Sequence, residues 1–175
     1  MKRVTSMMLI ALMSSGCGYA LAGRGTSLPD YIRVIGVPLF KNSTPVFDVD
    51  RVITERVRTE LIGRGKYEVK PEGVGVDAVV EATITSLSLT PATFDANRQA
   101  SRYYITITAS VSFKDLKSGK EIWANPSLSF RDEYQINNAA SGTDVTAFFG
   151  QETNAVARLA ADFARTVVSA MLEAF

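Results

Sequence analysis

The chain has 175 residues, with 19 lysine and arginine residues against 18 aspartate and glutamate residues, and it contains no histidine and a single cysteine. A charge this close to zero argues against general nucleic-acid binding, which requires a broad basic surface. Without histidine the chain lacks the commonest general base and metal ligand, and one cysteine does not form a zinc site. We therefore expect no catalytic residue, no metal and no cofactor.

Residues 1–16 have the order of a secretory signal peptide. Lys2 and Arg3 form a short positive start, residues 4–13 are mostly apolar, and residues 14–16 are small. The apolar run is too short for a membrane-spanning helix, which needs about 20 residues. We expect residues 1–16 to be a lipoprotein signal peptide that is removed, which leaves enough chain for one ordinary domain.

Cys17 directly follows the small residue Gly16. Three interpretations are open: a lipid-modified cysteine that holds the protein on a membrane, an intermolecular disulfide, and a buried structural thiol. Lipidation fits best, because a buried thiol would lie at the border of a cleaved segment. Ser14 stands where bacterial lipoproteins usually have leucine. Residues 17–31, rich in glycine and polar residues, are predicted to be the lipid anchor and a tether.

Residues 32–175 are predicted to form one domain. The β-branched residues of "YIRVIGVPLF" (31–40) indicate its first strand. Apolar residues then recur at helical spacing between Asp48, a candidate N-cap, and Gly63, a candidate end, which predicts a helix that covers a sheet over 49–62. The apolar stripe of this helix consists of Val49, Val52, Ile53, Val57, Leu61 and Ile62.

Four further segments indicate strands. "KYEV" (66–69) is a short candidate. Residues 78–89 alternate between apolar and polar side chains, and the alternation slips by one position after Ile84, as a β-bulge produces. Residues 103–113 alternate cleanly, and residues 121–135 return the chain, with a proline that marks an edge or an irregularity.

The last segment is predicted to be a helix that begins at Thr143 or Asp144 and packs on the sheet. Phe163 lies in the middle of its apolar stripe and is expected to be buried. The order of elements predicts an α+β fold: a two-layer sandwich with a mixed, mainly antiparallel sheet of about four strands covered by two helices.

The polar excursion from Pro91 to Arg102 is the least explained by folding. It contains Asn97 and Arg98 besides Arg102, and two tyrosines follow it. One interpretation is an ordinary solvated hairpin loop. The other is a contact surface for a phosphorylated lipid or a partner protein, because arginine side chains bind phosphates with two parallel hydrogen bonds.

Alternating strand directions predict that this excursion shares one tip of the molecule with the connection that follows the first helix. That tip would bring together four basic residues as a contact site: Arg64, Lys66, Arg98 and Arg102. Three lysines are expected at the opposite end: Lys114, Lys117 and Lys120.

The chain resembles the outer-membrane lipopolysaccharide-assembly lipoproteins of the LptE family. The resemblance covers nearly the whole chain after the signal segment, and it is carried by the front half, by "VDAVVEATITSL" (76–87) and by the pattern of the last helix. In the front half it rests on Cys17-Gly18-Tyr19, Leu21, Leu28-Pro29, Ile32, Ile35 to Phe40, Asn42 and Thr44.

The resemblance implies a protein without enzymatic activity. It implies a lipid anchor on the outer membrane, a periplasm-facing position inside the lumen of a β-barrel of the LptD type, and help in assembling that barrel and delivering lipopolysaccharide to the outer leaflet. Lipopolysaccharide itself is an expected ligand, and nucleic acid is not. The alternatives are a lipoprotein cofactor of another envelope machine, such as an activator of a peptidoglycan synthase or a transport auxiliary, and a secreted hydrolase. No nucleophile motif supports the hydrolase.

Overall fold

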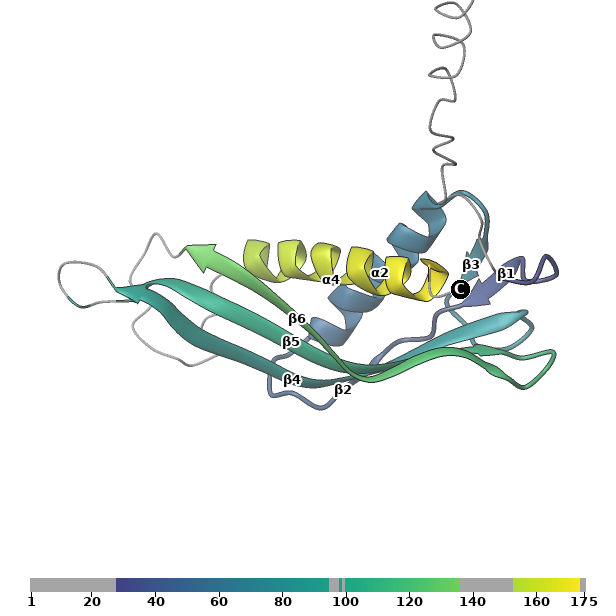
Figure 1. Ribbon diagram of the computed structural model, residues 1–175, viewed down its shortest axis with the longest axis horizontal. Coiled ribbons are helices and arrows are strands. Elements are labelled where there is room, and N and C mark those ends of the chain that lie inside the picture. The colour runs from purple at the N-terminus through teal and green to yellow at the C-terminus, as the bar shows by residue number, and fades with distance from the viewer. Residues whose placement is uncertain (1–27, 95–97, 99, 136–152, 174–175) are drawn as a thin grey trace, which may run out of the picture.

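The computed structural model describes residues 28–94, 98, 100–135 and 153–173. They form an α+β fold in which two helices cover one face of a long, curved mixed sheet (Figure 1). The predicted fold class is confirmed. The sheet has six strands rather than about four, because two short strands join the parallel part.

The elements follow the chain in the predicted order. They are β1 (Val34–Gly36), β2 (Lys41–Asn42), α2 (Val49–Gly63), β3 (Glu68–Lys70), β4 (Ala78–Phe94), β5 (Ala100–Asp115), β6 (Glu121–Gln135) and α4 (Thr153–Glu173). The first strand is shorter than predicted, and the short strand β2 was not among the predicted elements. The strand order is β3-β1-β4-β5-β6, with β2 also paired to β4.

The parallel part of the sheet differs from the trace that the sequence suggested. β1 pairs in parallel with both β3 and β4, so β4 runs in the same direction as β3 and not against it. The connection from β3 to β4 therefore has to cross β1, and it does so on the sheet face opposite the helices. A Cβ atom on Gly36 would lie 2.4 Å from the carbonyl oxygen of Glu72 in this crossing segment. Glycine is thus required at position 36 for steric reasons.

The antiparallel part is formed by β4, β5 and β6. The register of β4 against β5 shifts between Ile84 and Ser86, which confirms the predicted bulge. The polar excursion is mostly strand, because β4 continues to Phe94 and β5 already begins at Ala100. Residues 95–97 and 99 lie outside the described residues.

The helix α2 packs with the predicted side against the sheet, with two differences. Four of its six stripe residues are fully buried, but the side chain of Ile62 is 58% exposed. Asp48 makes no capping hydrogen bond to the helix backbone: it has a left-handed backbone with φ 66°, and its carboxylate pairs with Arg51 instead. The ion pair with arginine competes with the cap.

The helix α4 lies along the sheet beside α2 (Figure 1). Phe163 is 1% exposed, which confirms its predicted burial. The predicted caps Thr143 and Asp144 lie outside the described residues. Within the described parts of the chain, no helix has the length and apolar character needed to cross a membrane.

Candidate functional site

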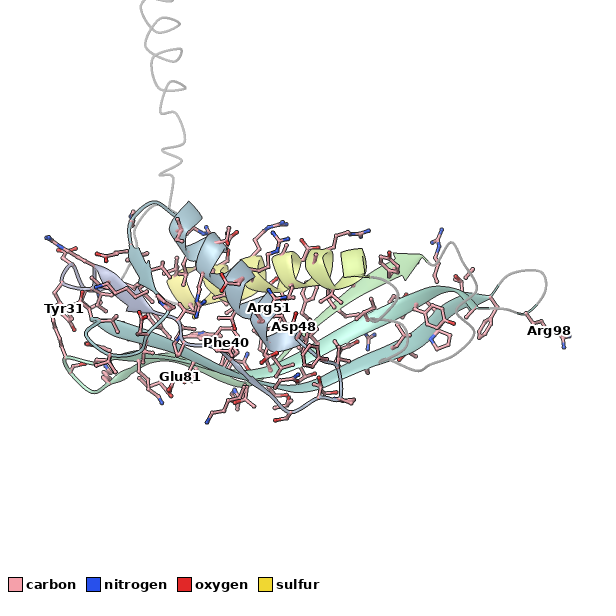
Figure 2. The ribbon with its side chains drawn as sticks, turned by 180° about the vertical axis from the view of Figure 1, so that it is seen from behind. Tyr31, Phe40, Asp48, Arg51, Glu81 and Arg98 are labelled. Atoms are coloured by element: carbon pink, nitrogen blue, oxygen red, sulfur yellow. The ribbon has the colours of Figure 1, made fainter. Side chains whose placement is uncertain are left out.

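The sheet has two different ends, a near end and a far end. At the near end, residues 28–33 enter the fold, β4 begins, and residues 116–120 connect β5 to β6. At the far end, β4 passes into β5 and β6 ends. Tyr31 and Arg98 mark these two ends in Figure 2, and most of the length of the molecule separates them.

The predicted gathering of four basic residues at one tip is wrong. The backbone N–H of Glu68, the first residue of β3, donates to the carbonyl of Arg33 at 2.9 Å, so Lys66 lies just before this contact at the near end. Arg98 and Arg102 lie at the far end. The error follows from the direction of β4, since its parallel pairing with β1 places the β4–β5 connection at the end opposite to the start of β3.

Arg64 and Lys66 have local roles at the near end. The Arg64 guanidinium donates to the Ser169 hydroxyl at 2.7 Å and lies 3.2 Å from the Glu60 carboxylate, so it connects α2 to α4. Lys66 lines a hollow of about 480 Å³ together with Arg33 and Leu28. These two residues are therefore not part of a surface with Arg98.

The far end carries exposed arginines next to aromatic rings. Arg98 is exposed in a left-handed backbone conformation with φ 62°. The side chain of Arg102 is 52% exposed and pairs with Glu133 at 3.1 Å. Arg131 lies over the ring of Tyr104, 5.4 Å from its centroid.

A fourth arginine comes from α4. The Arg158 guanidinium lies 5.6 Å from the centroid of the Tyr134 ring and 3.9 Å from the carboxylate of Asp132. Stacking on tyrosine holds a guanidinium plane in place while leaving its edge accessible. By the register of β6 against β5, Arg131 lies with Arg102 on the sheet face away from the helices, whereas Arg158 lies on the helix face, so the far end carries arginines on both faces. We call Arg98, Arg102, Arg131 and Arg158 the far-end arginines.

The near end holds a cluster of two carboxylates that the sequence analysis did not single out. Asp115 is 3% exposed and accepts hydrogen bonds from the hydroxyl groups of Ser118 (2.6 Å) and Tyr31, and from the backbone N–H of Lys117 (2.8 Å). These bonds stabilise the charged carboxylate, Ser118 foremost, and lower the pKa of Asp115 to about 2. The same contact with Asp115 raises the pKa of Tyr31.

Asp77 completes this cluster. It accepts from the backbone N–H groups of Arg33 and Val34 at 3.0 Å each, and the ammonium of Lys117 lies 3.0 Å away. The two backbone bonds are the main reason that the pKa of Asp77 is lowered to about 2. The ammonium of Lys117 also lies over the Tyr31 ring, 4.9 Å from its centroid. The cluster attaches the entering segment to β4 and to the β5–β6 turn, which is a structural role.

Among the residues that the structure describes, no group of three or more histidine, cysteine, aspartate or glutamate side chains is placed to hold a metal ion. The far-end arginines are chemically suited to bind phosphate or carboxylate groups. Cys17, the predicted lipidation site, lies outside the described residues.

Sequence reasoning found half of the far-end arginines. Arg98 and Arg102 were selected because they lie in one polar excursion. Arg131 and Arg158 were missed because only the register of β6 against β5, with Thr106 opposite Arg131, and the packing of α4 bring them there. No local pattern in the sequence indicates these positions.

Comparison with known proteins gives a family. A family model described as "LptE: Lipopolysaccharide-assembly" matches residues 32–171, which is most of the chain. No curated protein sequence matches the chain.

Solved structures show the same fold at low identity. The PelC dodecamer from Paraburkholderia phytofirmans matches with a TM-score of 0.53 at 13% identity, over 85% of this chain and 92% of that one. The hypothetical protein CT253 from Chlamydia trachomatis matches with 0.52 at 13% identity, over 78% and 94%. The rare lipoprotein B from Shewanella oneidensis reaches 0.49 at 15% identity, over 81% and 96%. At these identities the first two likenesses support the fold alone.

Proposed function

The chain belongs to the LptE family of lipopolysaccharide-assembly proteins, and on that premise we propose that it is an outer-membrane lipoprotein that plugs, and helps assemble, a lipopolysaccharide-inserting β-barrel of the LptD type. In this proposal residues 1–16 are removed, Cys17 carries the lipid, and residues 17–31 lead as the tether to the domain of residues 32–175 in the barrel lumen. The end of the tether, from Leu28 to Tyr31, already packs on the domain. The far-end arginines contact lipopolysaccharide phosphates or the wall of the lumen. None of these steps requires a catalytic group.

The observation that carries this proposal is the elongated domain with its two unlike ends. β4 has 17 residues, and at about 3.3 Å per residue it spans roughly 55 Å. A bilayer with its headgroups is about 40–45 Å thick. A domain aligned with a barrel axis and tethered at its near end therefore has the length to bring the far-end arginines to the opposite membrane surface.

The chemistry of the far end supports lipopolysaccharide as a ligand. Lipopolysaccharide carries phosphate groups, and an arginine fork offers them two charge-assisted hydrogen bonds. Arg102 and Arg158 are balanced by Glu133 and Asp132, and Arg131 lies on the Tyr104 ring and donates to the Thr106 hydroxyl. Arg98 is exposed at the far end, where an anionic ligand can reach it.

The test replaces Arg98 and Arg102 together with glutamate in the full-length lipoprotein. Each charge-assisted hydrogen bond contributes about 1.5–3 kcal/mol, so loss of even one should weaken binding to purified lipopolysaccharide by about tenfold or more. The remaining binding should depend less on salt. The matched control replaces Lys114 and Lys120 at the near end with glutamate and should bind as the unchanged protein does.

The outcome that contradicts this site assignment is normal binding by the far-end variant together with weakened binding by the near-end control. The barrel assignment is tested separately, by affinity capture of the native lipoprotein from detergent-solubilised membranes. A large β-barrel among the captured proteins supports the proposal. Capture of a periplasmic enzyme domain instead would favour a cofactor of another envelope machine.

The lipid anchor has its own test. Replacing Cys17 with serine should release the protein from membranes, except for the part that the barrel retains. Mass spectrometry of the mature native protein should show acyl chains on Cys17. An unmodified thiol there would contradict lipidation.

A further inference from the structure

The two outer edges of the antiparallel part of the sheet are protected very differently. β6 forms one edge and carries charged side chains and a proline: Glu121, Pro126, Arg131, Asp132 and Glu133. The other edge is the part of β4 after Ile84, and residues 86–94 of it carry no charge at all. Soluble proteins normally block open edges with charges, prolines or bulges, because unpaired backbone groups attract further strands. The β4 edge lacks this protection until Pro91.

The unprotected stretch of β4 pairs with β5 on one side, but its outer edge has no partner among the described strands. β2 pairs with β4 only at Thr83 and Ile84, and the backbone N–H of Ser43 adds one bond to the Ile84 carbonyl at 2.9 Å. Beyond this point, among the residues that the structure describes, no strand pairs with β4 on that side. The register shift after Ile84 on one side and Pro91, which has no backbone N–H, on the other bound a stretch of five residues, Ser86–Thr90, which spans about 16 Å.

The side chains of this stretch alternate between exposed and buried, as in a regular strand. Leu87 and Leu89 are buried against the helices, with exposed fractions of 8% and 6%, while Ser86, Ser88 and Thr90 face solvent. The stretch is therefore in a regular strand conformation, and an incoming strand would extend the sheet without rearranging it. A row of backbone N–H and C=O groups at strand spacing matches an extended peptide.

A hollow lies at the beginning of this edge, where the chain leaves β2. It has a volume of about 420 Å³, and its lining combines the apolar residues Leu39, Pro45, Val46 and Phe47 with polar and charged residues, among them Asp48, Asp50 and Arg51. Leu39 and Phe47 are 58% and 93% exposed. Figure 1 shows this loop next to the middle of β4. A fully exposed phenylalanine is costly in water and is typical of an interface anchor.

The loop that presents Phe47 is held in one conformation. The Asn42 side chain donates to the carbonyl of Val46 at 2.8 Å and accepts from the N–H and the hydroxyl of Thr44, both at 2.8 Å. Val46 is buried and anchors the loop. Asp48, the residue after Phe47, has a left-handed backbone, and its carboxylate accepts two hydrogen bonds from Arg51 (Figure 2 labels both). Phe47 is thus pre-positioned, which lowers the entropy lost on binding.

We propose that Ser86–Thr90 of β4 is a strand-addition site that takes an extended, uncharged segment of the barrel partner, with one apolar side chain of that segment seated between Leu39 and Phe47. This inference rests on the proposed function, since it names how the barrel holds its plug. A closed barrel wall has no free strand edge, so the segment comes from a partner loop or terminus. A polypeptide is the occupant because the site offers backbone hydrogen-bonding groups and apolar contact, and its strand residues offer no cation for phosphate.

The direct test is amide hydrogen exchange on the full chain, alone and in its complex with the barrel. Exchange at Ser86–Thr90 should slow at least tenfold in the complex, because amides that face the open edge gain a hydrogen-bond partner. The edge of β6 at Ser127–Ser129 is the internal control and should not change. The segment that pairs is then identified by photo-crosslinking from position 88.

Substitutions test the same site with a matched control. Ser88→Lys with Thr90→Lys adds charges beside the open edge and should reduce the amount of barrel complex at least tenfold. Ser127→Lys with Ser129→Lys adds the same charges on the already charged β6 and should not. Phe47→Ala should weaken the complex, whereas Val74→Ala, at a site 86% exposed at the near end, should not.

The outcomes separate this inference from the proposed function. A complex that forms without new protection of Ser86–Thr90, or with protection of β6 instead, overturns the strand-addition site and leaves the plug intact. Protection already present in the isolated chain overturns it as well: if the protection depends on concentration the occupant is a second copy, and otherwise it is a segment of the chain itself. If no barrel complex forms at all, both proposals fail.

Discussion

The near and far halves of the sheet are stabilised in different ways. In the near half, the sheet is covered by α2 and α4 on one face and by the β3–β4 crossing on the other, and Asp77 and Asp115 attach the entering segment through several hydrogen bonds. In the far half, β4, β5 and β6 continue, and no described strand covers their outer edges. Arginine side chains lie over tyrosine rings there. The near half is stabilised by burial and hydrogen bonds, whereas the far half exposes charged and aromatic side chains.

The largest expected difference between the two halves concerns phenylalanine. Phe163 is 1% exposed in the helix that covers the sheet, and Phe94 at the far end is 65% exposed. Phe163→Ala should lower the free energy of unfolding by about 3–5 kcal/mol, as large-to-small core changes do. Phe94→Ala should change it by no more than about 0.5 kcal/mol. Denaturant titration measures both, and equal losses would remove the distinction between the halves.

Gly36 tests the crossing that covers the near half. A Cβ atom at this position would meet the Glu72 carbonyl at 2.4 Å, so Gly36→Ala has to displace backbone. We expect a loss of about 1–3 kcal/mol, the usual cost of overpacking. Gly63→Ala is the control, because no atom lies within 4 Å of a Cβ atom there. If Gly36→Ala leaves the thermal unfolding midpoint unchanged, the β3–β4 connection can move away from the added Cβ atom at little cost in stability.

Acid should weaken the near half through Asp77 and Asp115. The pKa of each carboxyl is lowered to about 2 in the folded protein, below the unfolded value of about 3.9. Their contribution is therefore complete above about pH 4 and is lost as the pH falls from about 4 to about 2. The double variant Asp77→Asn, Asp115→Asn should be less stable at neutral pH and show a flatter stability profile in this range. An unchanged slope would mean that other groups cause the acid loss.

The smallest expected effect is at the far tip. Arg98 has φ 62°, a backbone region that costs a non-glycine residue about 1–2 kcal/mol. Part of this is offset by the greater freedom of glycine in the unfolded chain, so Arg98→Gly should stabilise the protein by up to about 1 kcal/mol. The same variant should bind lipopolysaccharide less well. Calorimetry and a binding titration on one sample check both, and a stabilised variant with full binding would show that the Arg98 side chain does not contribute to lipopolysaccharide binding.

Much of the fold was predictable because it depends on local periodicity. The alternation of β4 and β5, its slip after Ile84 and the buried stripe of α2 follow from side-chain spacing of 2 and 3.6 residues, and the structure confirms them. The short β2 was not predictable, since two residues carry no periodicity. Asp48 has the residue type of a cap, but its pairing with Arg51 depends on a backbone conformation that residue type does not specify.

The candidate site was predictable only where its residues are neighbours in the chain. The sequence by itself determined the two-layer α+β class, the long alternating strands and the presence of Arg98 and Arg102 in one polar excursion. Only the tertiary structure decided that β4 runs parallel to β1, and that direction moves Arg64 and Lys66 to the near end. Strand direction and register are set by pairing between segments far apart in the chain, and they determine the end and the face at which every side chain of the strand lies. The same long-range pairing brought Arg131 and Arg158 to the far end and left the outer edge of Ser86–Thr90 without a partner strand among the described residues.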